Sequence, residues 1–156
     1  MNVIRRKFLK STALFSATSA AIGAGLLAPG RAISAYLADA FEANDVSSAL
    51  KAAVGSDAHT ASSEIKLKAP DIAENGAVVP ITVSSTLPNV DSITILAPKN
   101  PSPMTSTYML QNGAEAFIST RIKLGKTSNI IAVVRSNGQL FSATKEVKVT
   151  IGGCGG

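Results

Sequence analysis

The chain has a single cysteine, Cys154, and glycines surround it: the sequence ends Gly152-Gly153-Cys154-Gly155-Gly156. A cysteine thiolate is a strong nucleophile that forms covalent adducts and disulfides. Glycine lacks a Cβ and loses much conformational freedom when it is ordered, so four glycines disfavour a fixed structure. We therefore predict that residues 152–156 form a flexible arm, called the arm below, which presents a thiol with no bulky neighbour.

The expected reactivity of this thiol points to a carrier. The arm contains no base or cation, and the basic residue nearest to it in sequence is Lys148. An unassisted cysteine has a pKa of about 8.5, so most of the thiol is protonated at neutral pH. Activation must then come from a protein that receives the arm. We expect no enzymatic activity of the chain itself, and a role as the substrate-bearing subunit of a multi-enzyme system.

The N-terminus has the pattern of an export signal. Arg5 and Arg6 are followed by Phe8 and Leu9 and then by an uncharged stretch from 11 to 30. A basic segment before an apolar one is typical of a signal peptide, and adjacent arginines mark the twin-arginine type. Residues 1–35 are thus predicted to be a twin-arginine signal that directs the chain to the periplasm. The alternative is a permanent anchor, but the stretch is rich in Ala, Ser and Gly, so no stable membrane insertion is expected after cleavage.

Charge and composition exclude several functions. The net charge is +5, but five basic residues and no acidic residue precede residue 36, and the remainder has 10 basic and 10 acidic residues. A neutral body has no general attraction for nucleic acid. With one histidine, His59, and one cysteine, the usual ligand sets for zinc, copper, haem or iron–sulfur clusters are missing. We therefore predict no metal site and no cofactor other than a covalent adduct on Cys154.

Two regions of different periodicity follow the signal. Residues 36–63 are predicted to be a helical segment with a polar linker, in which Asp45 or Ser47 caps a helix that ends at Gly55. From 64 to 151 apolar residues alternate with polar ones, as in strands. The strands are expected around 65–68, 79–83, 93–97, 118–124, 130–134, 140–141 and 147–151, with an Asn-Gly hairpin turn at 137–138.

This pattern predicts a mainly β protein, an immunoglobulin-like antiparallel β-sandwich with an N-terminal helical segment. The paired cysteines and core tryptophan of antibody domains are absent, so only the architecture is predicted. The run Ile130 to Val134 is apolar on both faces and needs cover on both, which favours a partner subunit. Arg121, Lys123 and Lys126 lie close together in sequence, either as a solvated surface or as a docking site for an acidic partner.

Three segments carry a family resemblance: the Gly-Gly-Cys-Gly-Gly end, residues 142–150 and residues 66–76. Together with the leader they resemble the SoxY family of the Sox sulfur-oxidation system. The resemblance implies a heterodimer with a second β-sandwich subunit, SoxZ. It further implies that a haem-containing enzyme joins thiosulfate to Cys154, that a hydrolase releases sulfate, and that another enzyme oxidises the remaining sulfane sulfur. The expected function is a periplasmic carrier of sulfur intermediates on Cys154.

Two other functions use the same residues. Ubiquitin-like sulfur carriers end in Gly-Gly and form a thiocarboxylate, but that chemistry needs ATP-dependent adenylation, which an exported protein would not meet. Alternatively, an exported β-sandwich could use Cys154 for redox sensing or for intermolecular disulfides, since the chain offers no internal partner.

Overall fold

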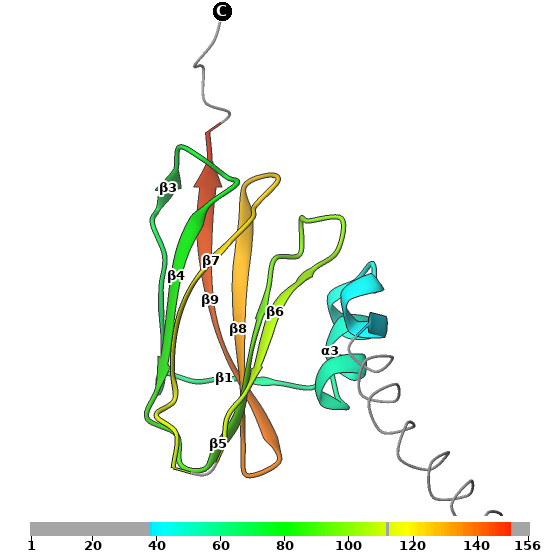
Figure 1. Cartoon of the computed structure of the whole chain (residues 1–156), viewed down its shortest axis with the longest axis vertical. Helices are drawn as coiled ribbons and strands as arrows, with labels where there is room; N and C mark the ends of the chain where they lie inside the picture. Colours follow the sequence, from blue (N-terminus) through cyan, green and yellow to red (C-terminus); the bar gives the residue numbers. More distant parts are fainter. Residues whose placement is uncertain (1–37, 112, 151–156) are drawn as a thin grey trace, which may run out of the picture. The chain divides into compact units, whose positions relative to one another are not determined.

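Two β-sheets face each other across an apolar core, and a short helix covers the outer face of the larger sheet (Figure 1). The computed structural model describes residues 38–111 and 113–150. The predicted signal, with Arg5 and Arg6, and the arm lie outside the described residues. The described elements are a helical stretch at 38–42, α3 (Val46–Val54), β1 (Thr60–Ala61), β2 (Ile65–Lys68), β3 (Ile72–Ala73), β4 (Val79–Ser85), β5 (Val90–Leu96), β6 (Met104–Met109), β7 (Phe117–Ile122), β8 (Ser128–Ser136) and β9 (Gln139–Val149).

The smaller sheet has the order β2-β4-β7 and the larger one β1-β9-β8-β5-β6, with β3 added beside β9. Neighbouring long strands are antiparallel throughout. Alternate residues of these strands point inward, so that β4 buries Val79, Ile81 and Val83 on one face. They pack against Ile93 and Ile95 of β5 in the core between the sheets. The predicted immunoglobulin-like sandwich with an N-terminal helical segment is confirmed.

Strand β8 is covered on both faces within this chain. Ile130, Ala132 and Val134 belong to the core between the sheets, whereas Ile131 and Val133 lie on the other face beneath the helix. Helix α3 contributes Ala49, Leu50 and Ala53 to this second cluster. The expectation that a partner must cover the run from 130 to 134 is therefore wrong, because α3 provides that cover.

The ends of α3 follow their sequence signals. Asp45 is the N-cap, and its carboxylate accepts a hydrogen bond of 2.9 Å from the backbone N–H of Ser48. Gly55 ends the helix with a φ of 83° and donates its N–H to the carbonyl of Lys51. The β8–β9 hairpin turns at Asn137 and Gly138, whose φ values of 49° and 76° are both positive, as a type I′ turn requires.

The polar linker and the last strand differ from the prediction. Residues 60–61 form β1, which pairs in parallel with β9 at Phe141 and Ser142. Strand β9 is one continuous strand of 11 residues, where the sequence suggested two shorter ones. Residues 72–73 form β3, which pairs in parallel with Lys148 and Val149 at the end of β9. A strand of two residues is too short to show an alternation of apolar and polar residues, so the sequence pattern does not predict β1 or β3.

Candidate functional site

The arm lies outside the described residues, including Cys154 and its neighbours Gly152, Gly153, Gly155 and Gly156. The described part of the candidate site is the end of the sandwich to which the chain of the arm is joined. Four described segments meet at that end of β9: residues 69–78, 97–103, 121–127 and 145–150. These segments together are called the arm end below. In Figure 1 it is the end at which the arrow of β9 stops.

Hydrogen bonds from two sides hold the last residues of β9. Lys148 donates its N–H to the carbonyl of Asp71 at 2.9 Å, and Thr150 donates to the carbonyl of Ala73 at 3.1 Å. On the other side, Val149 donates its N–H to the hydroxyl of Thr127 at 3.0 Å. The backbone is thus paired on both edges as far as Thr150, the last described residue. Residues 148–150 are called the root of the arm below.

Gly76 allows the chain to approach closely beside this point. Leu124 donates its N–H to the carbonyl of Gly76 at 2.7 Å. A Cβ on residue 76 would lie 2.4 Å from the carbonyl oxygen of Leu124 and 2.9 Å from a methyl group of Val149. Only glycine fits there without displacing the backbone. Gly76 thereby lets the 69–78 segment lie against both β9 and the 121–127 segment.

Asn100 fastens two loops of the arm end to each other. Its side-chain amide donates to the carbonyl of Lys123 at 2.7 Å and accepts from the N–H of Gly125 at 3.0 Å. Lys99 also donates its N–H to the hydroxyl of Ser128. These contacts place Lys99, Lys123 and Lys126 at the same end of the molecule as Lys148.

Chain connectivity limits where the thiol can lie. Cys154 is four residues beyond Thr150, and an extended chain spans at most about 3.3 to 3.6 Å per residue. The Cα atom of Cys154 is therefore within about 14 Å of that of Thr150. This distance is long enough for the thiol to enter a cleft of another protein while the sandwich stays outside.

The other residues considered from the sequence lie away from this end or have packing roles. His59 is exposed, and its Nδ1 is 2.9 Å from the hydroxyl of Ser142 on β9. Met104 is buried beneath α3, whereas Met109 on β6 is 68% exposed. Among residues 38–111 and 113–150, no group of three His, Cys, Asp or Glu side chains is placed to hold a metal ion.

Two carboxyl groups of the described residues have shifted pKa values, and both lie in the helix region. Hydrogen bonds from the backbone and side chain of Ser48 lower the pKa of Asp45. The hydroxyl of Ser47 and then the ammonium of Lys51 lower the pKa of Asp57, and Lys51 Nζ is 3.1 Å from that carboxylate. Both carboxylates thus interact with groups of the helix, Asp45 at its start and Asp57 from the loop that follows it.

Comparison with known proteins decides the family. The family model described as "Sulfur oxidation protein SoxY" matches residues 50–154, a span that takes in the sandwich and ends on Cys154. This chain belongs to the SoxY family. The family assignment confirms the resemblance found in the sequence, and it supports a sulfur-carrier role in sulfur oxidation.

Solved structures agree with this assignment. The sulfur carrier protein SoxY from Chlorobium limicola f thiosulfatophilum is 42% identical, with a TM-score of 0.60 over 66% of this chain and 94% of that chain. A superoxide reductase (neelaredoxin) from Ignicoccus hospitalis is 24% identical, with a TM-score of 0.50 over 59% of this chain and 81% of its own, and it shares the fold alone. No curated protein matches the chain.

Sequence reasoning missed the part that segment 69–78 has in holding β9. In the sequence, residues 66–76 contribute only to the family resemblance, and nothing there predicts a structural role for Gly76. The one available signal was Asn75-Gly76 between two apolar stretches, which marks a turn but not its contacts. The basic residues Arg121, Lys123 and Lys126 were recognised as neighbours in sequence, but Lys99 and Lys148 join them only through the fold.

Proposed function

We propose that the protein carries thiosulfate-derived sulfur covalently on Cys154 and presents it in turn to the enzymes of a Sox system. The observation that carries the proposal is the match to the SoxY family model across residues 50–154, because it includes the chain's only thiol. The firmly held root at Thr150 supports it, since a tethered thiol is useful when the body from which it extends is rigid.

The proposed chemistry begins with an oxidation. The Cys154 thiol and the sulfane sulfur of thiosulfate form an S–S bond, giving a Cys–S–S–SO3⁻ adduct while one proton and two electrons leave. The electrons pass to a haem-containing conjugating enzyme, as the family resemblance implies. A neutral-pH thiol with an ordinary pKa gives little thiolate on its own, so this enzyme must also promote removal of the proton.

The next step is hydrolytic. Water adds to the terminal sulfonate of the adduct, the S–S bond to that sulfur breaks, and sulfate leaves with two protons released. A persulfide remains on Cys154. A sulfane-oxidising enzyme can then convert the terminal sulfur of the persulfide to a sulfonate, with oxygen from three water molecules, while the enzyme accepts six electrons and six protons are released. Hydrolysis of that sulfonate releases sulfate and regenerates the thiol. The chain contributes the tether and the attachment atom, and it needs no cofactor beyond the covalent adduct.

The surroundings of the proposed carrier follow from the leader and the family. We infer export to the periplasm by the twin-arginine route from Arg5 and Arg6. No helix in the described part of the chain is long and apolar enough to span a membrane.

We further propose a stable heterodimer with a SoxZ-like β-sandwich subunit. Exposed Met109 on β6 and Phe117 on β7 lie on strands that pair on one side only among the described residues, and edges of this kind accept partners.

A Cys154→Ser variant tests the function. Thiosulfate oxidation would be measured in a reconstituted Sox system containing either protein, after confirming that both have the same thermal unfolding curve. The proposal expects oxidation to fall to the level seen without the carrier. Oxidation at near-normal rates with the serine variant contradicts it. Wild-type protein that forms only disulfide-linked dimers and no sulfur adduct would favour the redox-sensing alternative, because the Cys154→Ser variant cannot form a disulfide.

A further inference from the structure

Charge is unevenly distributed over the described part of this neutral sandwich. The arm end, as defined above, contains six basic side chains and three carboxylates, whereas the rest of the described residues contains four basic side chains and seven carboxylates. The basic side chains of the arm end are Lys99, Arg121, Lys123, Lys126, Lys145 and Lys148, and its carboxylates are Asp71, Glu74 and Glu146.

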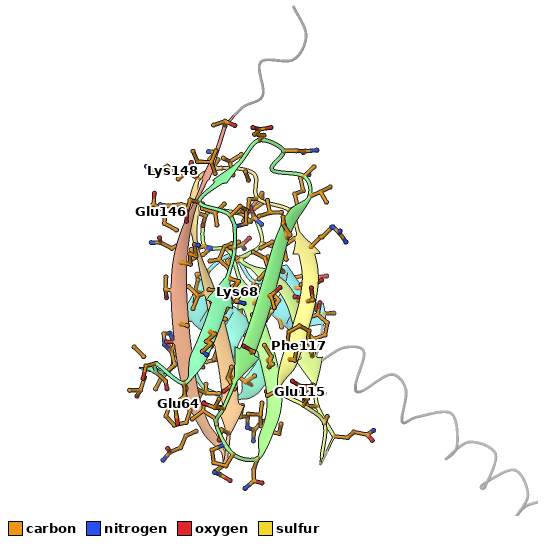
Figure 2. The ribbon with its side chains drawn as sticks, turned by 90° about the vertical axis from the view of Figure 1, so that its left-hand side faces the viewer. Glu64, Lys68, Glu115, Phe117, Glu146 and Lys148 are labelled. Atoms are coloured by element: carbon orange, nitrogen blue, oxygen red, sulfur yellow. The ribbon has the colours of Figure 1, made fainter. Side chains whose placement is uncertain are left out.

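Most of the basic groups at this end face solvent without a counter-charge. Lys145 pairs with Asp71, its Nζ lying 3.0 Å from the carboxylate. The other five are exposed, and none forms an ion pair with a carboxylate of the described residues. Figure 2 shows Lys148 with Glu146 near the end of β9, while Glu64 and Glu115 lie toward the opposite end of the sandwich.

The fold brings these side chains to one place from four separate segments. Asn100 joins the loop carrying Lys99 to the loop carrying Lys123, and Thr127 joins that loop to the end of β9 beside Lys148. By connectivity, the Cα atom of Cys154 is within about 14 Å of that of Thr150. Electrostatic interactions in solution reach about 10 Å at 0.1 M salt and about 30 Å at 0.01 M, so the lysines act on anything that approaches Cys154.

We propose that these basic side chains form a cationic collar that draws anionic sulfur reagents to the Cys154 thiol. This inference rests on the proposed function of Cys154, and it assigns the substrate class as small anions with an electrophilic or oxidisable sulfur. Clusters of one sign of charge raise the local concentration of oppositely charged reactants and their association rates. The collar acts by steering and does not touch the reacting atoms.

Two aromatic disulfides provide a test that needs no partner enzyme. Dithiobis(nitrobenzoate) carries two carboxylates, and dithiodipyridine is uncharged. In both cases the Cys154 thiolate attacks one sulfur, the reagent's S–S bond breaks and a mixed disulfide forms. The leaving thiolate takes the electron pair and is followed by its absorbance, as thionitrobenzoate from the first reagent and, after it takes up a proton, as thiopyridone from the second. Both rate constants are proportional to the fraction of Cys154 in the thiolate form, so their ratio does not depend on it. A change in this ratio between a variant and the wild type therefore reports a change in the attraction for the anionic reagent.

The test variant is Lys123→Gln/Lys126→Gln, and the matched control is Lys66→Gln/Lys68→Gln, which removes the same charge from exposed positions on β2. If the two charges are taken to lie about 14 Å from a dianion, the screened Coulomb energy predicts that their removal lowers the rate ratio about 3.5-fold at 0.01 M salt and about 1.6-fold at 0.1 M. The control should retain the wild-type ratio to within about 1.2-fold at the higher salt, where screening is strong over about 20 Å.

A second variant, Lys99→Gln/Lys148→Gln, should lower the ratio in the same direction, which guards against a local effect of the 121–127 loop. An unchanged ratio in both collar variants overturns the proposal, and so does an equal fall in the control. In that case the lysines are a solvated surface or a docking site for an acidic protein. Because the reagents react with any accessible thiol, failure here is distinct from failure of the carrier function, which the Cys154→Ser experiment tests.

Discussion

Replacing Gly76 with alanine would test whether close approach of segment 69–78 fixes the root of the arm. The new Cβ would lie 2.4 Å from the carbonyl oxygen of Leu124, a backbone atom that cannot rotate away. Moving it would strain the Leu124–Gly76 hydrogen bond of 2.7 Å and push on Val149 at the end of β9. The substitution therefore forces either a shift of the 121–127 loop or loss of its contact with the root.

The expected loss of stability in Gly76→Ala is large for the addition of a single methyl group. Overpacking in a filled site costs about 1–3 kcal/mol, and weakening one backbone hydrogen bond adds about 0.5–1.5 kcal/mol. We therefore expect Gly76→Ala to lower the free energy of unfolding by about 2–4 kcal/mol, and to lower Tm by about 10 °C or more for a domain of this size. Thermal and urea unfolding of the purified protein, followed by circular dichroism, would measure both quantities.

Gly125→Ala is the matched control, because it adds the same methyl group to a neighbouring loop of the arm end. The nearest atom to its Cβ would be the side-chain oxygen of Asn100 at 3.8 Å, an ordinary contact. This variant should unfold within about 0.5 kcal/mol of the wild type. If Gly76→Ala were as stable as Gly125→Ala, the packing described around the root of the arm would be refuted.

Three further predictions concern the helix and the arm. Leu50→Ala should lower the free energy of unfolding by about 2–5 kcal/mol, because Leu50 is fully buried between α3 and the larger sheet; urea unfolding would measure it, and a loss below about 1 kcal/mol would contradict the packing. The pKa values of Asp45 and Asp57 are lowered in the folded state, so their contribution to stability is present above the unfolded pKa of about 3.9 and is lost as pH falls through the folded values. Between about pH 5 and pH 2, the Tm of an Asp45→Asn/Asp57→Asn variant should therefore fall less than that of the wild type. Parallel curves of Tm against pH would refute this. Gly152→Val/Gly153→Val should react with a small neutral disulfide as the wild type does but be loaded more slowly by the conjugating enzyme, because β-branched residues stiffen the backbone and add bulk; equal loading rates would show that the glycines are incidental.

The sequence predicts the layers of this fold well because its long strands alternate regularly. Val79, Ile81 and Val83 all point into the core, and Asn137-Gly138 forms the turn that its residue types require. What covers the outer face of β8 was not predictable in the same way. The apolar residues Ile131 and Val133 show that a cover is needed, but only the fold shows that α3 supplies it.

The sequence likewise predicts only part of the candidate site, and the fold shows the rest. The single thiol with its four glycines was recognisable because residue type alone carries that chemistry. The hold of segment 69–78 on the end of β9 depends on the parallel pairing of Ile72 and Ala73 with β9, and the collar depends on basic residues from separate segments. Contacts between distant segments leave no local pattern, so both emerge only in three dimensions.

The intact mass of the protein, after incubation with thiosulfate and its conjugating enzyme, tests directly whether Cys154 carries sulfur. If it does, the mass increases by one thiosulfonate group, a thiol reductant reverses the increase, and the Cys154→Ser variant shows no increase. An unmodified wild-type protein, under conditions where the enzyme turns over thiosulfate, would show that Cys154 is not the carrier. So would an adduct that persists in the Cys154→Ser variant, because the sulfur would then be carried elsewhere.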